Sequence, residues 1–167
     1  MIFTEWMIAQ TQPNYLRMSQ PHLILGIGNE LLSDDGVGIH AIRLLEKNPP
    51  SNTTIVDGGT DFLSLIPYLE QCSKALVIDA MDAGGPPGTI YECSVNELAR
   101  PDHDYSLHEL GLISIMEFIE PDRRPTIHIL GIQPGRIAYG TDLSEPVGAV
   151  LLQVVTAARQ IIADFGV

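Results

Sequence analysis

Residues 23–38 read LILGIGNELLSDDGVG, and this stretch decides the fold class. It opens with a short apolar run that ends in glycines, as a strand buried on both faces of a parallel sheet does. Residues 37–45 then place apolar side chains at helical spacing, and the prolines within residues 48–50 end that helix. A buried strand that leads directly into an amphipathic helix predicts a layered α/β fold.

The rest of the chain continues this alternation of strands and helices. Further strands are expected at residues 53–57, 75–79, 89–93 and 126–132. Helices are expected at residues 62–69, at 106–119, and from about Ser144 onward with Pro146 in the first turn. No repeat or interdomain linker interrupts the pattern, so residues 21–167 are predicted to form one domain. Residues 1–20 are interpreted as an N-terminal tail, either disordered or translated from a misassigned start.

The composition excludes several classes of protein. The chain has 167 residues, of which 45% are hydrophobic and 18% charged, so it can bury enough apolar surface to fold. Its net charge of −12 argues against nucleic acid or an anionic membrane as the main partner. Residues 1–20 do not show the pattern of a secretory signal, and because the chain has no uninterrupted run of about 18 apolar residues, no membrane span is expected. With only two cysteines, Cys72 and Cys93, the sequence predicts a cytoplasmic protein without a disulfide framework.

Acidic and imidazole side chains gather where strands are predicted to end. In a layered α/β sheet, ligands bind at the carboxyl ends of the strands. The candidates near those ends are Asp34, Asp35, Asp57, Asp79, Asp82, His103, Asp104 and His108. They provide oxygen ligands with one or two imidazoles, which suits a metal ion.

Some of these acids have simpler structural interpretations. Asp34 is predicted to be an N-cap, and Asp35 falls in the first helical turn, where the helix dipole favours an acid. Asp57 precedes two glycines and is interpreted as a turn residue. Asp79 is harder to explain in this way, because it follows a fully apolar strand and burying a carboxylate without a partner is costly.

His108 is the strongest imidazole candidate. Residues 106–109 read SLHE, which fits a capping box and places His108 in the first turn of a helix. The positive end of the helix dipole disfavours the imidazolium there, and a metal ion needs the neutral ring. Asp35, Asp79 and His108 would therefore supply two carboxylates and one histidine, with coordination positions left open.

A nucleotide-binding loop is the alternative interpretation of the first motif. Gly26 and Gly28 follow a strand, as the first glycines of a dinucleotide-binding loop do. The third glycine of that pattern would fall at position 31, which is Leu31. Asp34 and Asp35 also occupy the place where a pyrophosphate needs positive potential. Because of these two departures, a non-catalytic nucleotide-binding module ranks second to a metal site.

Four motifs together resemble those of a known family. The stretches LGIGNELLSDDGVG, DGGT, VIDAMDAGGPPG and SLHELGL, in this order, are similar to the motifs of the nickel–iron hydrogenase maturation endopeptidases. The resemblance runs from about Leu23 to the last helix. It implies a three-layer α/β/α sandwich around a five-stranded, mostly parallel mixed sheet whose fourth strand is antiparallel.

The resemblance also implies a function and a partner. These enzymes remove a C-terminal extension from the precursor of the hydrogenase large subunit after nickel has been inserted into it. The family's metal-contacting and catalytic residues correspond to Asp35, Asp79 and His108, the first being Glu in many relatives. The nickel comes with the substrate, so no permanently bound cofactor is expected. Nickel would act as a Lewis acid, or would only be recognised while a carboxylate activates water. A nickel-site-binding module without peptidase activity is the non-catalytic alternative.

Overall fold

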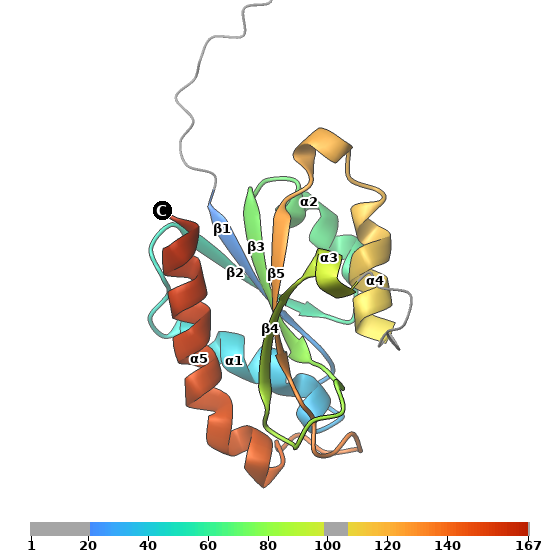
Figure 1. The fold of residues 1–167 in the computed structure, drawn as a ribbon, viewed down its shortest axis with the longest axis vertical. Coiled ribbons are helices and arrows are strands. Elements are labelled where there is room, and N and C mark those ends of the chain that lie inside the picture. The colour runs from blue at the N-terminus through green and yellow to red at the C-terminus, as the bar shows by residue number, and fades with distance from the viewer. Residues whose placement is uncertain (1–20, 99–106, 167) are drawn as a thin grey trace, which may run out of the picture.

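The computed structural model describes residues 21–98 and 107–166, in which five strands form one sheet (Figure 1). The strands are β1 (His22–Ile27), β2 (Thr53–Gly59), β3 (Lys74–Ala80), β4 (Ile90–Ser94) and β5 (Thr126–Ile132). Their order in the sheet is β2-β1-β3-β5-β4. β4 is antiparallel to β5, and the other neighbouring pairs are parallel. The predicted mixed sheet with an antiparallel fourth strand is confirmed, while the predicted tail at residues 1–20 lies outside the described residues.

Helices cover both faces of this sheet (Figure 1). One face carries α1 (Val37–Glu46) and α5 (Glu145–Phe165), and the other carries η2 (Phe62–Leu65), α2 (Ile66–Leu69) and α4 (Leu107–Met116). The remaining short elements are η1 (Asp34–Gly36), α3 (Val95–Leu98) and η3 (Pro121–Arg123). Each face of the sheet packs an apolar core against its helices, so the three predicted layers are present.

α5 has 21 residues, and by length and composition alone it could cross a membrane. Its buried side chains form a stripe at helical spacing: Val147, Val154, Ala158, Ile161 and Ile162. This stripe packs into the core that the sheet shares with α1. Such a stripe is typical of a helix that packs on a sheet, and it confirms the predicted amphipathic pattern.

The two cysteines do not form a disulfide, as the sequence predicts. Neither Cys72 nor Cys93 is part of a disulfide within the described residues. Burial raises the pKa of the Cys72 thiol to about 11, so this thiol stays protonated at neutral pH. Cys72 therefore contributes to the core beneath α4 by packing.

The alternation of side chains along β3 decides which layer each residue faces. Val77 packs into the core on the α4 side, and Ile78 packs into the core on the α1 side. Because successive side chains of a strand point to opposite faces, Asp79 belongs to the α4 side. Asp79 is only 5% exposed, so a carboxylate does lie at the end of a buried strand.

α1 begins in direct contact with the sheet because residue 38 is glycine. A Cβ atom at Gly38 would lie 2.2 Å from the carbonyl oxygen of Ile78 and 2.5 Å from that of Ile27. Both obstacles are backbone atoms of central strands, which a packed core holds in place. The contact brings the start of α1, and η1 before it, to the carboxyl ends of β1 and β3.

We expect Gly38→Ala to lower the free energy of unfolding by about 2–3 kcal/mol, because the added methyl group pushes α1 off the sheet. Gly148→Ala is the matched control, since the nearest atom to a Cβ there is the Cβ of Leu143 at 4.0 Å. The control lies in α5 and should be neutral or stabilising by up to about 1 kcal/mol. Urea unfolding measures both variants, and a Gly38→Ala protein as stable as the wild type would contradict the packing argument.

Candidate active site

Asp35 and Asp79 lie on neighbouring elements at the carboxyl edge of the sheet. Asp35 is the middle residue of η1, which follows β1 and contacts β3, and Asp79 is the penultimate residue of β3. The half-buried Asp35 accepts a 2.9 Å hydrogen bond at Oδ2 from the amide of Asn29. The buried Asp79 accepts a 2.8 Å hydrogen bond at Oδ1 from the amide of Ala80.

His108 is the second residue of the described part of α4 (Leu107–Met116), and its predicted place in the first turn of a capped helix stays a prediction. α4 covers the face of the sheet to which Asp79 belongs. A Cβ atom at Gly111 would lie 2.6 Å from the ring of Phe62, so the first half of α4 packs against η2. Because η2 follows the carboxyl end of β2, the backbone of His108 lies towards the same edge of the sheet as Asp35.

The side chains that the structure describes do not by themselves make up a metal site. Among the side chains in the described residues, no three from His, Cys, Asp and Glu lie close enough to hold a metal ion. The imidazole of His108 lies outside that set, as do the predicted cap Ser106 and the loop residues His103 and Asp104. A hard divalent ion takes six or more ligands, so two carboxylates at this edge would need the imidazole and a partner's ligands to complete a shell.

Asp34 is not the N-cap that the sequence predicts. Ser33 holds the cap position of η1 and Gly36 that of α1, and neither position has a side-chain cap bond. Asp34 is instead fully buried and accepts four hydrogen bonds from the segment before α5. The donors are the amides of Gly135 (2.8 Å), Arg136 (2.7 Å) and Ser144 (2.6 Å), and the hydroxyl of Ser144 (2.7 Å).

These hydrogen bonds keep Asp34 ionised. Burial alone raises the pKa of its carboxyl group, but the bonds from Ser144, Gly135 and Arg136 outweigh burial and hold the pKa below its usual value. A buried carboxylate that accepts four hydrogen bonds from a segment distant in the sequence holds the two segments together, and we call this set of bonds the Asp34 connection. Asp34 therefore fixes the loop that carries Asp35 against the segment that leads into α5.

Ser33 shows that the same loop is strained. Its backbone has φ 54° and ψ −115°, a region that glycine adopts more readily than serine. Ser33 is fully buried, and within the described residues its hydroxyl has no hydrogen-bond partner. Its amide donates a 2.7 Å hydrogen bond to the carbonyl of Gly140. A strained backbone conformation of this kind persists only where many surrounding contacts hold it in place. Such conformations are common beside functional sites.

Gln133 organises the loop that follows β3, and the sequence pattern does not reveal this role. Its Oε1 accepts hydrogen bonds from the amides of Ala83 (2.9 Å) and Gly85 (3.1 Å), and its Nε2 donates to Oδ1 of Asp82 at 2.8 Å. The bond from Gln133, with one from the amide of Gly84, lowers the pKa of Asp82. Asp82 thus stabilises the loop beside Asp79.

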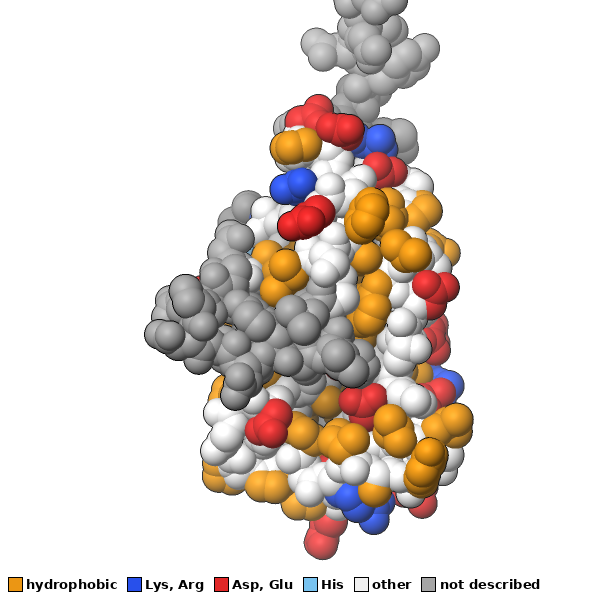
Figure 2. Space-filling model, turned by 90° about the vertical axis from the view of Figure 1, so that its right-hand side faces the viewer, with side chains coloured by type: hydrophobic (Ala, Val, Ile, Leu, Met, Phe, Trp, Pro, Cys, Tyr) orange, Lys and Arg blue, Asp and Glu red, His pale blue; other side chains and the backbone are white. Residues whose placement is uncertain are grey.

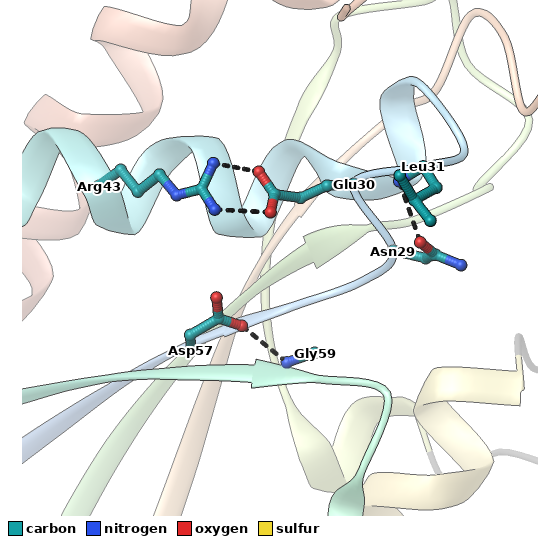
Figure 3. A network of polar contacts seen from close by, with 6 residues as sticks. All are labelled: Asn29, Glu30, Leu31, Arg43, Asp57 and Gly59. Atoms are coloured by element: carbon teal, nitrogen blue, oxygen red, sulfur yellow. Dashed lines mark hydrogen bonds and ion pairs between the residues drawn. The ribbon is translucent and has the colours of Figure 1, made fainter. Parts of the chain in front are cut away.

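Two further acids near the first motif take part in local structure (Figure 3). Asp57 lies inside β2, where it pairs with Gly26 of β1, so its interpretation as a turn residue is wrong; its Oδ1 accepts a 3.0 Å hydrogen bond from the amide of Gly59. Glu30 forms a two-pronged ion pair with Arg43 of α1. The charge of Glu30 is therefore already matched within the chain.

The glycines of the first motif allow close packing of the loop. Gly28 has φ +126°, and a Cβ atom there would lie 1.8 Å from the carbonyl oxygen of Asp35. Leu31, at the position of the third glycine of a nucleotide loop, is 63% exposed. With Asp34 and Asp35 at the helix start, this loop does not favour a pyrophosphate.

Known proteins match this chain over most of its length. The hydrogenase maturation protease family model matches residues 39–163. The chain is 34% identical over 152 residues to the hydrogenase expression/formation protein HupD of Bradyrhizobium diazoefficiens, covering 87% of this chain and 79% of that protein. It is 33% identical over 159 residues to the hydrogenase expression/formation protein HoxM of Azotobacter vinelandii, covering 90% and 76%.

Solved structures agree with these sequence matches. The [NiFe] hydrogenase maturation protease HybD of Thermococcus kodakarensis has a TM-score of 0.73 at 29% identity, covering 85% of this chain and 99% of that one. The hydrogenase maturating endopeptidase HybD of E. coli shares the fold with a TM-score of 0.79 at 24% identity, covering 87% and 94%. The family match includes the positions of Asp79 and His108, and the curated relatives are covered over most of their length. The chain therefore belongs to the hydrogenase maturation protease family and is a peptidase.

Proposed function

We propose that this peptidase removes the C-terminal extension of a nickel–iron hydrogenase large-subunit precursor in the cytoplasm, and only when that precursor already holds nickel. Membership of the family supports the class of substrate. The observation that carries the proposal is the common edge of the sheet that bears Asp35, buried Asp79 and the start of α4 with His108. We propose these three residues as metal-contacting and catalytic.

The chemistry of this ligand set explains why the ion would come with the substrate. Two carboxylates and one imidazole leave several coordination positions open, so the enzyme alone would hold nickel weakly. A precursor that already binds nickel through its own thiolates supplies the missing ligands. Asp35, Asp79 and His108 would then complete the shell, and docking would test whether nickel is present.

Hydrolysis needs an activated water molecule and a polarised carbonyl group. Nickel held beside the scissile peptide can polarise the carbonyl, and a carboxylate at the same edge can take the proton of the attacking water. Polarisation of the carbonyl by nickel and mere recognition of nickel would have different effects on the kinetics. Exchanging nickel in the precursor for another divalent ion should lower kcat if the ion polarises the carbonyl, and should raise KM if the ion is only recognised.

We expect the purified enzyme to shorten nickel-loaded precursor at its C-terminus and to leave nickel-free precursor intact. Mass spectrometry of both reactions detects the loss of the extension. Efficient cleavage of nickel-free precursor would contradict recognition of the ion. Nickel-loaded precursor that keeps its full mass would instead favour a module that binds the nickel site without peptidase activity.

A further inference from the structure

Three large apolar side chains are exposed beside the loop that carries Asp35. Leu31 is 63% exposed, Ile137 52% and Tyr139 94%. Leu31 lies between β1 and η1, whereas Ile137 and Tyr139 lie between β5 and α5. We name these three residues the apolar rim. Hydrophobic side chains gather at the lower end of the molecule in Figure 2, which is the end where β1, β3 and β5 finish in Figure 1.

Backbone hydrogen bonds hold the two loops of the apolar rim together. The amide of Gly140 donates to the carbonyl of Leu31 at 3.0 Å, and the amide of Ser33 donates to the carbonyl of Gly140 at 2.7 Å. The amide of Asp34 donates to the carbonyl of Arg136 at 3.2 Å, beside the buried Asp34 carboxylate. The exposed side chains therefore stand on a fixed backbone, and a partner that binds them loses little conformational entropy in the loops.

Two charged side chains beside the apolar rim, Glu30 and Arg136, have partners within the chain. Glu30 is paired with Arg43. Arg136 donates from Nη2 to the carbonyl of Asp142 at 3.3 Å. An apolar centre with a polar margin is the usual anatomy of a protein–protein interface, and exposed aromatic side chains often dominate such contacts. The rim is thus suited to apolar contact with a folded protein.

We propose that the apolar rim is the docking surface for the large-subunit precursor and contacts apolar side chains next to the precursor's nickel site. This inference rests on the proposed function. Leu31 and Asp35 belong to one short loop that is closed by the bond from the Asn29 amide to Asp35. We therefore expect a folded protein that brings its metal ion to Asp35 to contact the exposed Leu31 as well. The rim and the candidate active site would form one continuous contact.

A second copy of this chain is less compatible with this geometry. A stable dimer buries about 800 Å² on each partner, which is much more than three side chains provide. A precursor that also fills the candidate active site adds the missing area.

The test compares the kinetics of rim variants on nickel-loaded precursor. We expect Tyr139→Ser to raise KM roughly tenfold with kcat within a factor of two, as loss of one interface anchor does. Tyr139→Phe keeps the apolar ring and should retain the wild-type KM. Leu152→Ser is the matched control, because Leu152 is 71% exposed on α5 and should leave both constants unchanged. Since Tyr139 is almost fully exposed, its replacement should not alter the thermal unfolding temperature.

The outcomes separate this inference from the proposed function. Wild-type enzyme that cleaves the precursor, with Tyr139→Ser giving the same KM, overturns the docking surface alone. A Tyr139→Ser enzyme with a lower kcat and an unchanged KM also overturns the docking surface alone. Sedimentation tests the remaining possibility. If the wild-type enzyme is a dimer, and Tyr139→Ser is a monomer with an unchanged KM, the rim binds a second copy of this chain instead of the precursor. Wild-type enzyme that does not shorten the precursor overturns both proposals.

Discussion

Replacing His108 with alanine is expected to lower the rate of precursor cleavage by more than about 100-fold while leaving the fold intact. Removing a group that merely orients a metal ligand costs 10–100-fold, so loss of a direct ligand should cost more. Position 108 lies near the start of α4, and the buried side chains of that helix lie further along, at Leu112 and Ile115. The substitution should therefore affect catalysis far more than packing.

The experiment measures the cleavage rate on nickel-loaded precursor together with the thermal unfolding temperature. His40→Ala is the matched control, because His40 lies on α1, on the other face of the sheet from α4. It should retain wild-type cleavage within a factor of about three. Normal cleavage by a folded His108→Ala protein would remove His108 from the active site and leave Asp35 and Asp79 without their imidazole partner.

The fold could be predicted because its signals are local in the sequence. β1 and β3 are continuous apolar runs, since both faces of a central parallel strand are covered by helices. β4 is the antiparallel strand at one side of the sheet, but only its Glu92 is exposed, so the alternation expected of a half-exposed strand is not present in its burial. The stripe of α5 does follow from helical spacing within a single segment.

The roles of individual polar residues at the site depend on contacts that no local pattern carries. Asp34 and Asp35 are adjacent identical residues, yet Asp34 is a buried connection and Asp35 is half-exposed at the sheet edge. The donors to Asp34 lie 101, 102 and 110 residues further along the chain. The partners of Gln133 lie 48–51 residues before it. An N-cap was the natural local interpretation of Asp34, and only the assembled fold overrules it.

The Asp34 connection should make a large contribution to stability. We expect Asp34→Asn to lower the free energy of unfolding at pH 7 by about 2–4 kcal/mol, because the amide group faces donors and the charge on the hydrogen bonds is lost. In a domain of this size the thermal unfolding temperature should fall by about 5–15 °C. Asp142→Asn is the matched control, since Asp142 is an exposed acid in the same loop and should stay within about 0.5 kcal/mol of wild type.

The same connection predicts a dependence on pH with a definite sign. Because the pKa of Asp34 is lower in the folded protein than in the unfolded chain, its contribution is fully present above the usual carboxyl pKa near 4 and is lost as the pH falls through the folded value. The gap in unfolding temperature between wild type and Asp34→Asn should therefore be wide at pH 7 and narrow steadily below about pH 4. Thermal melts at pH 7, 5 and 3 measure this gap. A gap of constant width across that range would mean that the four donors stabilise Asp34 no more in its charged form than in its neutral form, and would contradict the structural role assigned to this carboxylate.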